Sequence, residues 1–225
     1  MLFDFHTHTF LSDGELSPIE LIRRAHVRGY TAIGIADHAG PGNLDVVVRQ
    51  LAAAARFCRE HWDIRVLPGV ELTHHPPVAI DEAARAARDQ GAELVIVHGE
   101  TPVEPVTPGT NWSAVSSSAV DVLGHPGFLT MDEAAEAARQ GVFVELSARR
   151  GHSLTNGHVA RACLEAGANL VVDSDAHHPD DLLTRETALK VARGAGLTVE
   201  QARRAADEAP LLLLARLERR GAWRR

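Results

Sequence analysis

The sequence has few cysteines and few basic residues relative to acidic ones. Cys58 and Cys163 are its two cysteines. They lie far apart, each inside a helical pattern, so we expect two buried thiols and neither a disulfide nor a metal ligand. Lysine and arginine number 23 against 30 aspartates and glutamates, a formal net charge of −7. Only residues 216–225 are locally basic, and the composition therefore disfavours nucleic acid as a partner.

Long hydrophobic runs are also missing. The longest, such as Leu211–Ala215, are far too short to span a bilayer, and Met1–His6 lacks the charged and apolar regions of a secretory signal. We therefore expect a cytoplasmic protein with no membrane partner. The length of 225 residues suffices for the core of one domain, predicted to span 1–225. The oligomeric state stays open, because Leu211–Leu214 could pack against the chain itself or against a second copy.

A helix, a glycine and an apolar strand follow one another repeatedly. Ser17–Glu20 matches a capping box with proline at the first helical position, which predicts a helix over Pro18–Arg28 that ends at Gly29. A β-rich run over 30–36 follows directly. The same order recurs before the strands predicted at 94–97, 142–144 and 170–172.

The predicted strand ends are spaced by roughly one βα unit, about 30 residues or fewer. They lie at His8, His38, Glu71, His98, His125, Ser147 and Asp175. Apolar strands that alternate with amphipathic helices favour a parallel sheet covered by helices, and polar groups at the strand ends favour a barrel. No glycine-rich nucleotide fingerprint follows the first strand. We predict an α/β fold of the (β/α)7 barrel type, TIM-like, with helices from about residue 198 closing it.

Metal-binding residue types stand directly after these strands. In His6-Thr7-His8 the two imidazoles lie at i and i+2, so on a strand they project to the same face. Asp175-Ala176-His177 repeats this geometry with a carboxylate and an imidazole. The two motifs follow the first and last strands, which are neighbours only if the barrel closes. The intervening strands end on His38, Glu71, His98 and His125.

Each of these residues also has an ordinary structural interpretation. His38, His98 and His125 could individually be core or capping histidines, and Glu71 a solvated charge at a strand end. Their common position after apolar strands favours one shared site instead. The other histidines that we considered fall on helices or in loops and are expected not to bind metal: His26, His61, His74, His75, His158 and His178.

As a set, these motifs resemble the PHP (polymerase and histidinol phosphatase) family from end to end. They are HTHTxxSDG at His6–Gly14, then Asp37-His38, Gly69–Glu71, Val97-His98, Gly124–Pro126 and Ser174–His177. The resemblance implies a distorted (β/α)7 barrel with a trinuclear site, commonly zinc, manganese or iron, that hydrolyses phosphoesters. Carried over by position, the metal ligands would be His6, His8, Asp13, His38, Glu71, His98, His125, Asp175 and His177.

Nine ligands suit two or three divalent ions that share a bridging carboxylate, for which Glu71 is the natural choice. Such ions would lower the pKa of a bridging water, supply hydroxide at neutral pH and attract phosphoryl oxygens. Arg149 and Arg150, in one of two long loops expected on the substrate side (99–111 and 148–156), would complete the phosphate clamp. Asp175, His177 or a metal-bound water would protonate the leaving group.

We therefore expect metal-dependent hydrolysis of a small phosphomonoester, with histidinol phosphate as one candidate. A phosphodiesterase, nuclease or cyclic-phosphate hydrolase of the same family is the alternative, and it would call for a broad basic groove. Amide or ester hydrolysis on a related barrel usually relies on a carbamylated lysine, whereas the one lysine, Lys190, lies in a late predicted helix. A non-catalytic metal-binding regulatory barrel is disfavoured by the complete ligand set.

Overall fold

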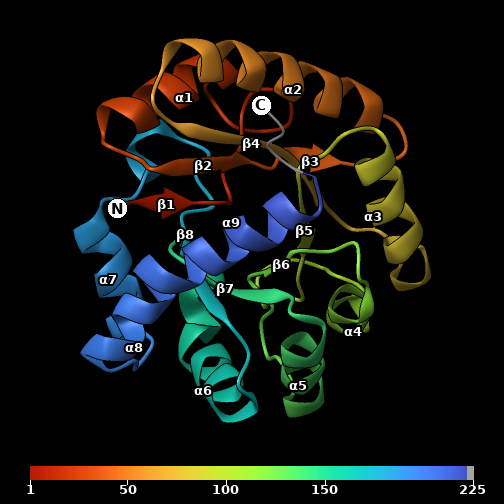
Figure 1. The fold of residues 1–225 in the computed structure, drawn as a ribbon. Coiled ribbons are helices and arrows are strands. Elements are labelled where there is room, and N and C mark those ends of the chain that lie inside the picture. Colours follow the sequence, from red (N-terminus) through yellow and green to blue (C-terminus); the bar gives the residue numbers. More distant parts are fainter. Residues whose placement is uncertain (222–225) are drawn as a thin grey trace.

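Parallel strands form the centre of the molecule. The computed structural model describes residues 1–221, so 222–225, the end of the predicted domain and of its basic segment, lie outside the described residues. The strands follow the order β1-β2-β4-β5-β6-β7-β8, with the short β3 paired to β4 (Figure 1). Their bounds are β1 (Phe3–Asp4), β2 (Ala32–Ile35), β3 (His38–Ala39), β4 (Arg65–Leu72), β5 (Leu94–His98), β6 (Val122–Gly124), β7 (Phe143–Ser147) and β8 (Leu170–Asp173).

The sheet closes into a barrel where its first and last strands meet. Just beyond β1 and β8, Thr7 and Ala176 form a parallel bridge, and the backbone N–H of His8 donates to the carbonyl of Ala176 at 2.8 Å. The predicted α/β barrel is therefore confirmed. Closure also brings the two i, i+2 motifs side by side, as expected from their positions after the first and last strands.

Two buried aspartates fasten this seam below the bridge. The N–H of Phe5 donates to Asp173 Oδ1 at 2.6 Å, and the N–H of Ser174 donates to Asp4 Oδ1 at 3.0 Å. Each side chain thus replaces a ladder hydrogen bond across the seam. Both carboxyl groups are fully buried, and burial raises the pKa of Asp4 to about 7 and that of Asp173 well above its usual range.

Removing the Asp173 carboxylate, which accepts the hydrogen bond from the N–H of Phe5, should weaken the barrel. Asp173→Ala leaves the buried N–H of Phe5 without a partner, and we expect a loss of about 1–3 kcal/mol in the free energy of unfolding. Asp173→Asn retains a carbonyl oxygen and should cost clearly less. Denaturant titrations with a chelator present, so that metal binding does not contribute, would compare the two variants; equal stability of both with wild type would rule out a role for this contact.

Helices surround the barrel, and those predicted before the strands β2, β5, β7 and β8 are present as α1, α3, α5 and α6. Their bounds are α1 (Pro18–Val27), α2 (Leu44–His61), α3 (Ile80–Asp89), α4 (Thr110–Ser116), α5 (Met131–Gln140), α6 (Asn156–Ala166), α7 (Arg185–Gly194), α8 (Val199–Arg203) and α9 (Ala209–Arg219). Thr130 and Glu133 form a complete capping box on α5. At α1 only half of the expected box forms, because Ser17 accepts from the N–H of Glu20 while the Glu20 carboxylate pairs with Arg24.

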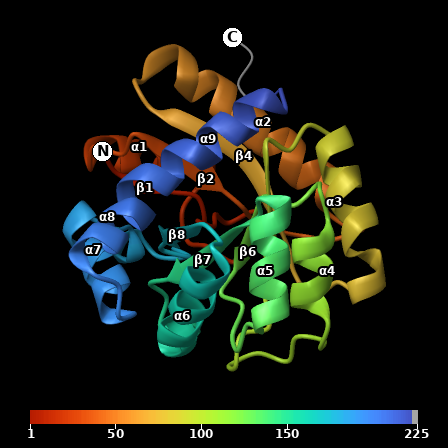
Figure 2. The same cartoon turned by 60° about the horizontal axis from the view of Figure 1, so that its bottom comes forward.

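The last helix covers the amino end of the barrel. Figures 1 and 2 show α9 lying across the strands, inside the ring of outer helices. Leu213, Leu214 and Leu217 pack with residues at the starts of the strands, including Phe3, Ala32, Leu94, Val122 and Phe143. Of the leucines considered for a contact between copies, Leu213 and Leu214 are therefore used within the chain, whereas Leu211 and Leu212 stay exposed. The carboxyl end of the barrel is left open for a site.

Two smaller expectations can be checked here. Cys58 and Cys163 are both buried free thiols, as predicted. Among residues 1–221, no helix combines the length and the hydrophobicity needed to cross a membrane.

Candidate metal centre

A buried carboxylate stands at the middle of the carboxyl end of the barrel. Glu71, near the end of β4, has Oε1 at 3.3 Å from the Nε2 atoms of both His6 and His125. Its Oε2 lies 2.8 Å from His38 Nδ1 and 3.7 Å from His8 Nε2. One carboxylate therefore faces four imidazoles from three places on the barrel rim: His6 and His8 after β1, His38 in β3 and His125 after β6.

Asp175 joins this group from the far side of the seam. Its Oδ1 lies 3.2 Å from His8 Nε2 and 3.8 Å from His6 Nε2, and its Oδ2 lies 3.7 Å from His125 Nε2. His6, His8 and Asp175 place three donor atoms within 4.8 Å of one another, as do His6, Glu71 and His125. Either set could hold a metal ion.

A second group forms at the rim around Asp13. Asp13 Oδ1 lies 3.1 Å from His177 Nε2 and 3.4 Å from His38 Nε2, and His8 completes the set of donors. Asp37, buried beside His38, accepts hydrogen bonds from Thr9 and Ser12 and so fixes the turn that carries Asp13. The Asp37-His38 motif thus contributes one candidate ligand and one residue that holds the loop.

His98, the ninth predicted ligand, points elsewhere in the cluster. Its ring lies edge-on to His125 with centroids 4.4 Å apart, but its Nε2 lies 3.0 Å from Glu104 in the loop after β5. The structure thus places all nine predicted residues at one end of the barrel. It groups eight of them by mutual donor distance, and it turns His98 toward a residue that was not among the predictions.

The buried donor atoms of this cluster are poorly satisfied by the protein itself. His6 Nε2, both ring nitrogens of His8, His125 Nδ1 and Glu71 Oε1 have no hydrogen-bond partner within the described chain. Such atoms are costly to bury unless something binds them. Imidazole nitrogens and carboxylate oxygens together are the donor set of zinc, manganese and iron sites, so the residues present fit divalent metal ions.

The ionisation of the cluster also favours cations. Burial disfavours a charge on Glu71, but His6, His98 and His38 hold the pKa of its carboxyl well below the usual range. Burial likewise opposes a charge on His38, yet Glu71 and Asp13 raise the pKa of His38 to about 10. A proton on His38 therefore supplies positive charge beside Glu71 and Asp13, and a divalent ion can replace it.

Backbone strain accompanies the site. His74, His125 and Asp175 have φ values of 55°, 24° and 52°, in the left-handed region that side chains other than glycine rarely adopt. Two of the three are predicted ligands, and the third lies in the loop after β4. Strained residues of this kind gather at functional sites, where the surrounding structure holds them in place.

The two arginines predicted as a phosphate clamp differ in their contacts. Arg149 Nη1 donates to the carbonyl of Asp175 at 3.1 Å and lies 2.5 Å from His177 Nδ1, so its guanidinium supports the loop that carries both. Arg150 is exposed. Both line a groove of about 380 Å³ with Ser174 and Asp181, and Arg149 lies beside Asp175 and His177, the predicted catalytic residues.

Three residues near the cluster were not assigned from the sequence. Glu145, in β7, lies with Oε2 2.6 Å from His6 Nδ1, and Glu104 and His152 come from the two long loops. A carboxylate inside the apolar strand Phe143–Ser147 is the one signal that could have identified Glu145. Of the histidines expected not to bind metal, His158 lies in the first turn of α6, next to the loop that precedes this helix.

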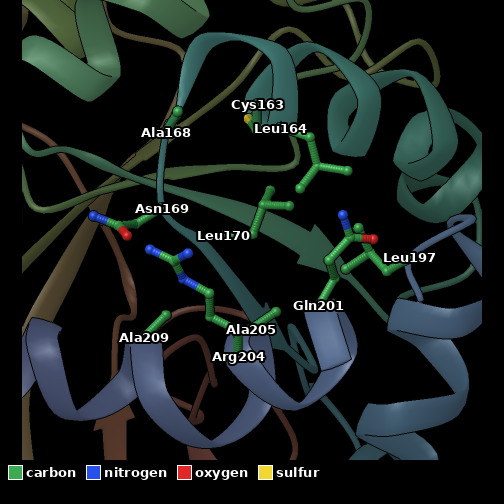
Figure 3. A pocket seen from close by; sticks show the side chains of 11 residues that line it. Cys163, Leu164, Ala168, Asn169, Leu170, Leu197, Gln201, Arg204, Ala205 and Ala209 are labelled. Carbon is green, nitrogen blue, oxygen red and sulfur yellow. The ribbon is translucent and has the colours of Figure 1, made fainter. Parts of the chain in front are cut away.

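A separate hollow of about 170 Å³ lies at the other end of β8, beneath α6 and beside α8 (Figure 3). Figure 3 shows Gln201 and Arg204 among mostly apolar neighbours, including Cys163, Leu164 and Leu197. The described residues that line it include neither histidine nor carboxylate. Hydrolytic metal chemistry is therefore supported at the carboxyl end of the barrel and not here.

Comparison with known proteins identifies related chains. A family model described as PHP domain matches residues 4–216. An uncharacterised protein of Methanocaldococcus jannaschii is 46% identical over 96% of this chain and 100% of its own length. A probable phosphatase of Thermoanaerobacter pseudethanolicus is 28% identical over 88% of each chain.

Solved structures share the fold at low sequence identity. A chain in the structure of archaeal ribonuclease P with mature tRNA aligns with a TM-score of 0.68 at 12% identity, covering 96% of this chain and 91% of its own. Histidinol phosphate phosphatase from Lactococcus lactis, complexed with zinc, L-histidinol and phosphate, aligns with a TM-score of 0.58 at 14% identity, covering 88% of this chain and 94% of its own. At these identities the likeness concerns the fold alone.

Proposed function

The chain belongs to the PHP domain family, and on that premise we propose that it is a metal-dependent phosphoesterase that hydrolyses a small phosphomonoester. The observation that carries the proposal is the convergence of buried, unpartnered imidazole and carboxylate atoms around Glu71. The relatives named probable phosphatases support the same reaction class. Histidinol phosphate is a candidate substrate, since a structural neighbour is a histidinol phosphate phosphatase.

Two or three divalent ions would be held by the nine residues, with Glu71 and Asp175 placed to be shared between ions. Zinc, manganese and iron all suit these donors. Ions bound here would activate water and neutralise the phosphoryl oxygens. The remaining ligands would be His6, His8, Asp13, His38, His98, His125 and His177.

The chain's own groups would then bind and orient the substrate. Arg150, exposed beside the groove, would take phosphoryl oxygens, because a guanidinium matches them bidentately. Arg149 would hold Asp175 and His177 through the contact with the Asp175 carbonyl. Asp175 and His177 would lie next to the leaving oxygen, and one of them or a metal-bound water would protonate it.

The test is inorganic phosphate release from a panel of phosphomonoesters that includes histidinol phosphate and an aryl phosphate. Manganese- or zinc-loaded protein should release phosphate, and chelated protein should not. Loaded protein that is inactive on every monoester but cleaves diesters, cyclic phosphates or single-stranded nucleic acid would replace the proposal with the diesterase alternative. Loaded protein that cleaves none of these would favour a non-catalytic barrel.

The arginine assignments predict two different kinetic effects. Arg150→Ala should raise KM about tenfold with little change in kcat, because it removes one charge-assisted hydrogen bond worth roughly 1.5–3 kcal/mol. Arg149→Ala should also lower kcat, because the Asp175–His177 segment loses its support. Steady-state kinetics on the best monoester would separate them, with Arg161→Ala, on α6, as a control; unchanged KM in both variants would remove the arginines from the substrate site.

A further inference from the structure

His152 has the geometry of a metal ligand although it belongs to none of the strand-end motifs. It lies in the 3₁₀ turn His152–Thr155 after β7 and is 4% exposed. Its Nδ1 is held by Thr101 Oγ1 at 2.7 Å. Its Nε2 points into the cluster, 3.8 Å from Asp175 Oδ2, and its ring stacks on that of His125 with centroids 4.1 Å apart.

A similar arrangement recurs in two of the predicted ligands. In His6 and His98, Nδ1 lies 2.6 Å from a carboxylate oxygen and 3.2 Å from a carbonyl oxygen respectively, while Nε2 faces a carboxylate. Metal-binding histidines typically use one ring nitrogen in this way, which fixes the tautomer and leaves the other nitrogen for the ion. His158 differs, because its Nε2 is bound to the carbonyl of Leu129.

Glu104 connects His152 to His98, the predicted ligand that belongs to none of the donor groups described above. Its Oε2 lies 3.0 Å from His98 Nε2, and its Oε1 lies 3.4 Å from His152 Nε2. A carboxylate between two imidazoles, at the edge of a multinuclear site, is placed to share a cation with them.

The donor atoms of His125, His152 and Asp175 lie within 4.8 Å of one another, and all three residues are buried. We propose that His152 and Glu104 are metal ligands in addition to the nine, binding one ion together with His125, Asp175 and His98. This inference rests on the metal binding in the proposed function. It assigns loops 99–111 and 148–156 a shared role, since one ion would tie them together over the barrel.

Metal content tests the assignment independently of activity. Wild type, His152→Gln and Glu104→Gln would be stripped with chelator, equilibrated with graded manganese by dialysis, and analysed for bound metal per chain. We expect each variant to bind one equivalent of manganese at least about tenfold more weakly than wild type does. A roughly tenfold loss of metal affinity is the lower end of the range for mutations of residues that only support a ligand. The remaining equivalents should bind as in wild type.

Matched controls separate ligand loss from general damage. Glu100→Gln makes the same change in the same loop, where Glu100 Oε1 accepts from the N–H groups of Gly109 and Asn111, and a glutamine carbonyl can still accept them. His158→Gln is the control for His152. Both should bind manganese like wild type.

Each outcome has one meaning. If wild type binds no manganese or zinc, the proposed function fails. If wild type binds metal and the two variants match it in stoichiometry and affinity, the ligand assignment is overturned. If, in that case, the variants differ from wild type only in KM, Glu104 and His152 are substrate contacts. Because Glu104 is partly exposed, Glu104→Gln remains a usable test even if His152→Gln fails to fold.

Discussion

Replacing Glu71 by glutamine should reduce phosphate release by about 10³-fold or more and remove at least one equivalent of bound metal. Glu71 contacts His6, His125 and His38 with its two oxygens and is the group best placed to join separate ions. Glutamine keeps the shape but loses the charge and one oxygen donor. Metal ions contribute several kcal/mol of transition-state stabilisation, and each 1.36 kcal/mol is about tenfold in rate.

The control for this variant is Glu15→Gln at the same rim. Glu15 pairs with His178 at 3.1 Å, and both side chains are largely exposed, so the change removes a carboxylate–histidine contact outside the cluster. Kinetics and metal analysis of both variants should show loss in Glu71→Gln only. Full activity with full metal content in Glu71→Gln would exclude a shared carboxylate at the centre of the site.

Removing the metal should lower the thermal stability of the wild-type protein substantially. Free metal at about 1,000 times its dissociation constant stabilises the folded state by roughly 4 kcal/mol per site. For a chain of this size, roughly 1 kcal/mol corresponds to about 2–4 °C in Tm, so losing one such site should lower Tm by about 8–16 °C. The buried carboxylates and imidazoles, left with protons as their only cations, account for the direction of the change.

A melting series with chelator, and then with manganese or zinc restored, measures this shift. The loss should reverse on adding metal, and Glu71→Gln should show a smaller difference between its two states than wild type. Equal Tm values with and without metal, for wild type, would mean that the ions do not bind selectively to the folded cluster.

Much of the fold could be predicted because its signals are local. The repeat of helix, glycine and strand follows from capping residues and apolar runs, and the paired motifs after the first and last strands indicated that the sheet closes. The seam itself could not be predicted. The contacts of Asp4 with Ser174 and of Asp173 with Phe5 join residues 170 and 168 positions apart, and no periodic pattern in the sequence indicates them.

The site residues likewise divide into those that could be predicted from the sequence and those that could not. Eight of the nine residues follow strands and could be brought together from sequence because the carboxyl ends of parallel strands meet at one end of a barrel. Asp13, in the turn beyond the first strand, was assigned through the resemblance to the family motif. Glu104 and His152 lie in irregular loops, whose paths depend on contacts such as that between Thr101 and His152. Glu145 lies within an apolar strand and acts through His6, a role visible only once the barrel interior is formed.

The central claim is that the cluster around Glu71 holds the ions that hydrolyse a phosphomonoester. The most direct measurement is a titration of chelated protein with manganese or zinc in which bound metal and phosphate release are followed together, with Glu71→Gln in parallel. We predict that wild-type activity rises as the sites fill and that the variant stays near background. Phosphate release without metal, or equal release by wild type and Glu71→Gln at full loading, would contradict the claim.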